Sequence, residues 1–246
     1  QYLPPGTDRS SELYSATKTM GAVVTGIAAY ETRNLARTGR KTGPLSDTDR
    51  VDHWLDSFSY NDDAQVAHVL AMVAQNSSLT DGNMQYQYDT VGSTQINSLS
   101  NIINAAVAQD SARLGSNIEQ FTRKFLFQPL GMTNSTWTSG SSNKTFAYTW
   151  SSTLHDMARL GLVILHRGMY NGKRVLSESW IYRMTHPAFE ESNTVYGYLT
   201  WLNTGQRVLP SVPASSYFAF GAGSSFTWAE PQRRLVVIVR WLAADH

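Results

Sequence analysis

The chain contains no cysteine among its 246 residues. Disulfides, thiolate nucleophiles and Cys-ligated metals are therefore excluded. Charge is also sparse, because only 16% of the residues are charged and the formal net charge is +1. No broad basic surface for nucleic acid or anionic lipid is expected. The longest apolar runs, such as residues 235–239, are too short to cross a bilayer. These absences predict no nucleic-acid partner and no membrane partner.

Several well-known catalytic patterns are missing too. The sequence has no Gly-x-Ser-x-Gly elbow and no His-Glu-x-x-His zinc motif. The glycine-rich stretch 168–173 has the wrong spacing for a phosphate-binding loop, and Arg174 follows its lysine. His155 and Asp156 are adjacent on an expected helix, so they do not face each other, and Asp156 is interpreted as structural. We predict no metal and no cofactor.

Hydrophobic periodicity divides the chain into helices and strands. Apolar residues at helical spacing over residues 15–34 predict a buried helix. Further helices are expected at 51–58, 65–74, 96–108, 117–126, 154–166 and 177–184, and strands at 198–202, 217–220, 225–229 and 235–241. This order predicts an α+β or α/β sandwich forming one domain, 1–246. A helical lobe is expected at about 35–190, and a sheet lobe from 1–34 together with 191–246.

A Ser-x-x-Lys tetrad stands at the start of the first long helix. Ser15 and Lys18 are one helical turn apart, so the ammonium nitrogen can reach the hydroxyl. If burial removes the proton from the lysine, the pair becomes a nucleophile with its own base. A second match, residues 141–144, lies in a polar loop. Lys144 is expected to stay in water and remain protonated, so this second match is discarded.

Two further elements can carry chemistry. Tyr88 precedes an expected helix and could point its phenol into a cleft, where it could shuttle a proton. Gly221 and Gly223 follow an expected strand, where a backbone amide can approach a ligand closely. Taken alone, the first element is more often a packing tyrosine and the second an ordinary β-turn.

Together, the three elements resemble the serine β-lactamase and penicillin-binding-protein superfamily. That family has Ser-x-x-Lys, then Tyr-x-Asn, then a Lys-Thr-Gly or His-x-Gly strand. The most similar branch holds the family VIII-type carboxylesterases and the 6-aminohexanoate-dimer hydrolases. The resemblance implies an antiparallel sheet flanked by helices, plus an all-helical lobe. Supporting stretches lie at 127–133, 153–161, 167–177 and 196–198.

The resemblance also implies a role for each matching residue. Ser15 would be the acylated nucleophile, Lys18 the general base and Tyr88 the proton relay. The backbone amides of Ser15 and Ala222 would form the oxyanion hole. Thr90 would contact the substrate at the position where the family often has Asn. The substrate would be a small molecule.

The sequence departs from the family pattern at the last strand. Its motif reads Ala219-Phe220-Gly221, with no Lys or His at the first position, and Gly223 follows it. An apolar pair cannot bind a substrate carboxylate as that cation does. This favours a neutral or apolar ester, amide or lactone, with Gly221 and Gly223 beside the substrate. The alternatives are a β-lactamase or D-peptidase, an acyltransferase of the same superfamily, and a catalytically inactive binding module.

The ends of the chain are shorter than in that family. Only fourteen residues precede Ser15, which suggests a processed or incomplete chain, or a second polypeptide or protomer that supplies the missing sheet elements. Glycosylation sequons at Asn76, Asn134 and Asn143, and the scarcity of lysine beside Ser, Thr and Asn, favour a secreted glycoprotein.

Overall fold

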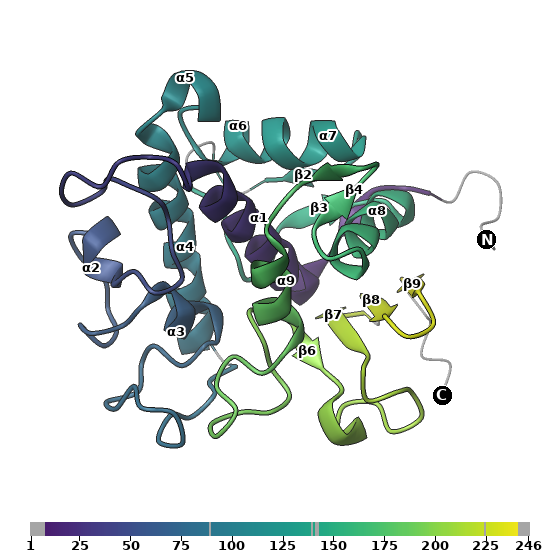
Figure 1. Cartoon of the computed structure of the whole chain (residues 1–246). Coiled ribbons are helices and arrows are strands. Elements are labelled where there is room, and N and C mark those ends of the chain that lie inside the picture. Colours follow the sequence, from purple (N-terminus) through teal and green to yellow (C-terminus); the bar gives the residue numbers. More distant parts are fainter. Residues whose placement is uncertain (1–7, 89, 139, 141–142, 224, 241–246) are drawn as a thin grey trace.

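A computed structural model describes residues 8–88, 90–138, 140, 143–223 and 225–240 (Figure 1). Its α-helices are α1 (Thr17–Thr32), α2 (Val51–Trp54), α3 (Val66–Leu70), α4 (Thr90–Ala108), α5 (Ser111–Leu114), α6 (Ile118–Thr122), α7 (Gln128–Leu130), α8 (Leu154–Leu165) and α9 (Glu178–Thr185). Other helical turns are η1 (Tyr14–Ala16), the π-helical η2 (Arg123–Phe127) and η3 (Thr204–Gln206). Each predicted helix is present, most with shorter bounds.

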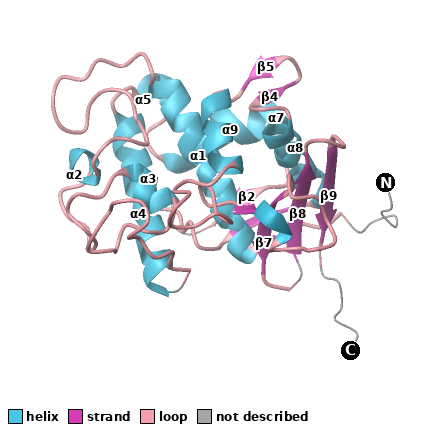
Figure 2. Cartoon of the chain, turned by 60° about the horizontal axis from the view of Figure 1, so that its bottom comes forward, coloured by secondary structure: helices cyan, strands magenta, loops and turns pink. Residues whose placement is uncertain are grey.

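In the part of the chain that the structure describes, the strands form three separate antiparallel sheets. The largest has the order β6-β7-β8-β9, a second has the order β1-β3-β2, and β4 pairs with β5 as a hairpin. Their bounds are β1 (Ser11–Glu12), β2 (Thr136–Trp137), β3 (Trp150–Ser152), β4 (Met169–Tyr170), β5 (Lys173–Arg174), β6 (Trp201–Leu202), β7 (Tyr217–Gly221), β8 (Ser225–Glu230) and β9 (Leu235–Val239). Helix α8 packs on β8 and β9 (Figure 2).

Helix α1 runs through the middle of the molecule and contacts α4, α9 and β7 (Figure 1). Val23, Val24 and Ile27 are at most 1% exposed. Burying a side chain of this kind contributes about 1.5–3 kcal/mol. The apolar stripe of the sequence therefore anchors the central helix, whose first turn follows η1, the turn that contains Ser15.

The sheets differ from the prediction in their short strands. Strands β1 to β5 have two or three residues each, too few for a hydrophobic alternation to be recognised. Strands β2 to β5 lie within the 35–190 range for which a helical lobe was expected. Strand β3 pairs with β1 from the start of the chain, and this pairing brings residues 150–152 beside the entrance to α1.

The expectation for Lys144 was wrong. Its side chain is 2% exposed, and Nζ lies 2.9 Å from a carboxylate oxygen of Glu119 and 2.6 Å from the carbonyl oxygen of Gly140. The lysine is held by a carboxylate rather than by water. Ser141 of the same tetrad lies outside the described residues.

The sequons differ in their surroundings. Asn134 and Asn143 are exposed, whereas the side-chain amide of Asn76 donates to the carbonyl oxygens of Val73 and Gln85. A glycan on Asn76 would therefore have to displace these bonds, and secretion stays a prediction. Within the described part of the chain, no helix combines the length and apolar character needed to cross a membrane.

Candidate active site

Ser15 lies half-buried in η1, the turn that leads into α1. Strand β3 holds this turn in place, because the Leu13 amide donates to the Trp150 carbonyl at 2.8 Å. Tyr14 has a φ of +47°, in the left-handed region that a bulky side chain seldom adopts. Such strain persists only where the surrounding structure imposes it, and it gathers at functional sites. The backbone immediately before Ser15 is thus fixed in an unusual conformation.

Lys18 faces Ser15 from the first turn of α1. Its Nζ donates to Ser15 Oγ at 3.1 Å and to the Ala147 carbonyl at 3.1 Å. The residue is only 3% exposed, and burial lowers the pKa of its ammonium group from 10.5 to about 8. None of the ion pairs among the described residues involves Lys18. The amine therefore loses its proton far more easily than a lysine in water.

The carbonyl that holds Lys18 is itself rigidly placed. The amides of Phe146 and Ala147 both donate to Asn97 Oδ1, on α4. The Phe146 ring lies on the backbone of α1 at Gly21, where an added Cβ would be 2.3 Å from the ring. Only glycine permits this approach. Contacts with α1 and α4 thus hold the Ala147 carbonyl in place, and this carbonyl in turn positions Lys18 Nζ.

Tyr88 completes the group from the segment before α4. Lys18 Nζ lies 4.7 Å from the centre of its ring. Burial raises the pKa of the Tyr88 hydroxyl, and a hydrogen bond with the Ser15 side chain partly offsets this rise. The phenol therefore stays protonated at neutral pH and can donate a proton. Asp89, the next residue of the motif, lies outside the described residues.

Aromatic rings gather around Tyr88. The Trp201 ring lies 5.7 Å from that of Tyr88 and 6.5 Å from that of Phe220. Tyr86 and Tyr196 lie against the same tryptophan, with centroids 5.9 and 5.1 Å away. Trp201 is half-buried and Tyr88 is 38% exposed, so part of this aromatic surface is open. It offers a wall of apolar, uncharged surface next to Ser15.

The end of β7 lies directly against the Ser15 turn. A Cβ added to Gly221 would lie 2.1 Å from the Leu13 carbonyl oxygen and 3.3 Å from the Ala16 amide nitrogen. Ala222 and Gly223 follow at once in the turn to β8, where Gly223 has a φ of +70°. Thr90 is the first residue of α4, and its side chain is outside the described part of the structure.

The structure thus brings Ser15, Lys18 and Tyr88 together and places the β7 turn beside them. Sequence reasoning missed Ala147, because a backbone carbonyl carries no sequence signal. It also did not foresee how Tyr196, Trp201 and Phe220 group around Tyr88.

The rejected pair lies elsewhere and has other partners. The Asp156 carboxylate accepts from the Asn134 amide, the Ser135 hydroxyl and Arg159, as its structural interpretation predicts. His155 pairs with Asp8 instead. In residues 8–240, leaving out the undescribed positions, no group of three or more His, Asp or Glu side chains is arranged to hold a metal ion.

Comparison with known sequences gives one family. A family model described as Beta-lactamase matches residues 2–241. Among curated protein sequences, none matches this one.

Solved structures resemble the whole fold. A protein from Bacillus anthracis assigned as a 6-aminohexanoate-dimer hydrolase is 12% identical, with a TM-score of 0.69 over 97% of this chain and 69% of its own. A penicillin-binding protein from Bacillus halodurans is 14% identical, with a TM-score of 0.65 over 97% and 84%. A family VIII carboxylesterase is 16% identical, with a TM-score of 0.64 over 94% and 77%. The fold predicted from the sequence is confirmed.

Proposed function

Because the chain belongs to the beta-lactamase family, we propose that it is a serine hydrolase that forms an acyl-enzyme on Ser15. The observation that carries this proposal is the buried amine of Lys18, 3.1 Å from Ser15 Oγ and with a pKa lowered to about 8. A hydroxyl beside an amine that is readily neutral is an activated nucleophile.

The first half of the reaction makes the acyl-enzyme. Neutral Lys18 takes the proton of Ser15 as Oγ bonds to the substrate carbonyl carbon, and the carbonyl oxygen becomes an oxyanion. The amides of Ser15 and Ala222 stabilise that oxyanion. When the tetrahedral intermediate collapses, the leaving alcohol or amine takes a proton from Tyr88, whose own proton is replaced from Lys18. Water then attacks the acyl carbon and gives a proton to neutral Lys18. As the bond between that carbon and Ser15 Oγ breaks, Oγ takes this proton back from Lys18, which releases the acid and restores the Ser15 hydroxyl.

The substrate class follows from the uncharged wall of the site. Ala219 stands where the resembling family has a cation, and Tyr88, Trp201 and Phe220 surround the approach to Ser15 with apolar surface. We therefore propose a neutral or apolar ester, amide or lactone. Comparing p-nitrophenyl butyrate, a short linear amide and nitrocefin tests this choice, and preferred turnover of nitrocefin would contradict it.

A fluorophosphonate probe tests the nucleophile. We expect covalent labelling of the wild-type protein and none of Ser15→Ala. Ser10→Ala is the matched control, because Ser10 is exposed and precedes the site by a few residues. Equal labelling of Ser15→Ala and wild type would refute the assignment. A wild-type protein that is folded but unlabelled and inactive on every substrate would be a binding module instead.

A further inference from the structure

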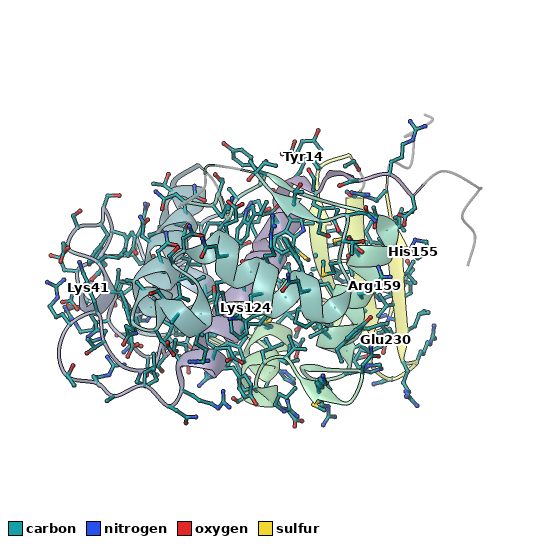
Figure 3. The ribbon with its side chains drawn as sticks, turned by 90° about the horizontal axis from the view of Figure 1, so that it is seen from above. Tyr14, Lys41, Lys124, His155, Arg159 and Glu230 are labelled. Carbon is teal, nitrogen blue, oxygen red and sulfur yellow. The ribbon has the colours of Figure 1, made fainter. Side chains whose placement is uncertain are left out.

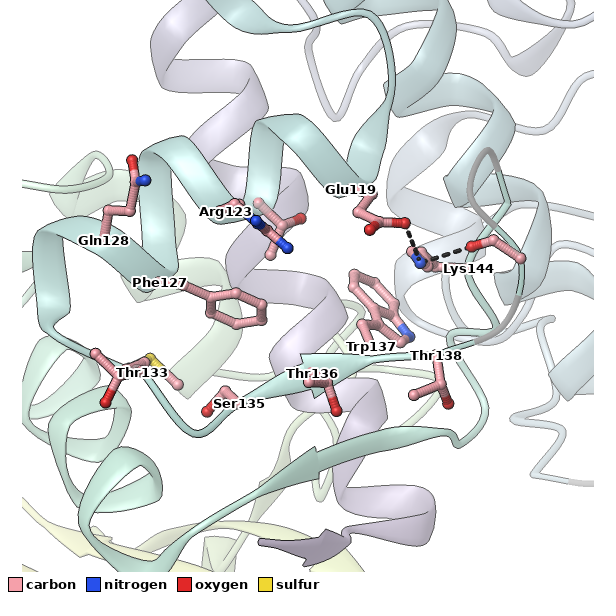
Figure 4. Close-up of a pocket in the computed structure, with 13 residues that line it drawn as sticks. Glu119, Arg123, Phe127, Gln128, Thr133, Ser135, Thr136, Trp137, Thr138 and Lys144 are labelled. Carbon is pink, nitrogen blue, oxygen red and sulfur yellow. Dashed lines mark hydrogen bonds and ion pairs between the residues drawn. The ribbon is translucent and has the colours of Figure 1, made fainter.

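A cavity of about 610 Å³ lies apart from Ser15, between the α6–η2–α7 helical segment and strand β2 (Figure 4). Its lining combines aromatic and apolar side chains with hydroxyls and two cations. Phe127 and Trp137 face each other across it, and Arg123 projects from the helix into the same space. Sites for small organic molecules have this volume and this mixture of surfaces.

Among the described residues that line the cavity, one cation has no charged partner. Lys144 is paired with Glu119 at 2.9 Å, so these two charges cancel. Arg123 is exposed, and its guanidinium forms no hydrogen bond or ion pair with any described residue. The cavity therefore offers one free guanidinium next to aromatic surface. A guanidinium matches the two oxygens of a carboxylate through parallel hydrogen bonds.

The backbone presents this arginine in an unusual way. Residues 123–127 form a π-helical turn, in which the Gln128 amide donates to the Arg123 carbonyl five residues earlier. Turns of this kind are rare and occur frequently at functional sites. The hydroxyl of Thr122, which lines the cavity and is 2% exposed, has no hydrogen-bond partner among the described residues. A buried hydroxyl without a partner is costly unless a ligand or water satisfies it.

We propose that this cavity binds a small organic monocarboxylate, with its carboxylate on Arg123 and its apolar body between Phe127 and Trp137. One free positive charge selects a single carboxylate over a neutral molecule, and the two rings select an aromatic or alkyl body. The site does not involve Ser15, so it stands whether or not the proposed hydrolase activity is found.

Isothermal titration calorimetry with 4-phenylbutyrate tests the proposal, with 4-phenylbutan-1-ol as the uncharged counterpart. For a ligand of this size we expect a Kd on the order of millimolar. Arg123→Gln should weaken binding of the acid roughly tenfold or more, because it removes a charge-assisted hydrogen bond. The alcohol should bind the wild type as weakly as the acid binds Arg123→Gln.

Lys124→Gln is the matched control. Lys124, labelled in Figure 3, is the next residue along the helix and carries the same charge. Its Nζ donates to the Arg113 carbonyl, and the residue does not line the cavity. This variant should bind the acid within about twofold of wild type, since removing an exposed charge has little local effect. Equal weakening by both variants, equal binding of acid and alcohol, or no heat with wild type up to tens of millimolar would each overturn the proposal.

Discussion

The proposed reaction makes activity depend on the proton of Lys18. With a pKa of about 8, roughly one lysine in eleven is neutral at pH 7, compared with about one in 3000 at the ordinary value of 10.5. Burial therefore raises the population of active base about 300-fold at neutral pH. Because the neutral form is the base, kcat/KM should rise with pH, roughly tenfold between pH 6 and 7 and less than twofold between pH 8 and 9.

Hydrolysis of a butyrate ester, followed by titrating the released acid at constant pH, measures this profile. A midpoint near pH 8 would identify Lys18 rather than Tyr88 as the titrating group, because the pKa of Tyr88 is raised above 10.0. Lys18→Arg should be inactive throughout, since guanidinium does not deprotonate. A flat profile from pH 6 to 9, or a midpoint above 10, would refute the reasoning.

Three further predictions use the same geometry. Tyr88→Phe should lower kcat by roughly 10²- to 10⁴-fold while the midpoint of the pH profile stays in place, and a shifted midpoint would identify the phenol as the titrating group. Gly221→Ala should lower activity, and it should lower the free energy of unfolding by about 1–3 kcal/mol, because its methyl would lie 2.1 Å from the Leu13 carbonyl oxygen. Gly39→Ala is the control, because a Cβ there would have nothing within 4 Å. Equal thermal stability of the two variants would contradict the close contact between Gly221 and Leu13. Lys18→Met should raise the free energy of unfolding at pH 6–7 by about 1–3 kcal/mol. The gain should shrink between pH 8 and 10.5, because there the native wild-type lysine is already neutral while the unfolded one still binds a proton. Denaturant unfolding that shows no gain at pH 7 would disprove the cost of burying this charge.

The sequence predicted the local part of this site and not the tertiary part. Ser15 and Lys18 could be paired in advance because one helical turn fixes their separation. Tyr88 required the family resemblance, since nothing in its neighbours says which of twelve tyrosines reaches Ser15. Ala147 could not be found at all, because every residue has a carbonyl. Lys144 was misplaced for a related reason: its partner, Glu119, lies 25 residues away and leaves no local trace.

The secondary structure shows the same difference between elements set by a local pattern and elements set by their tertiary partners. Long periodic segments such as α1 and α8 were predicted because many residues share one pattern. The predicted helix at 117–126 ends as α6 at Thr122, and a π-helical turn follows. The sequence could not show this change, because one extra residue per turn leaves the apolar pattern almost unchanged. The two-residue strands depend entirely on their partners.

The protonation state of Lys18 depends on the charge of the substrate bound beside it. Lys18 is readily neutral because it is buried and because none of the described ion pairs reaches it. A substrate carboxylate placed beside it would favour the ammonium form and raise its pKa, which would remove the base that the reaction needs. A cation at the end of β7 could hold such a carboxylate away from the amine, but the apolar pair Ala219 and Phe220 stands there instead. A neutral acyl group leaves the amine uncharged, so the apolar end of β7 and the lowered pKa of Lys18 favour the same substrate class.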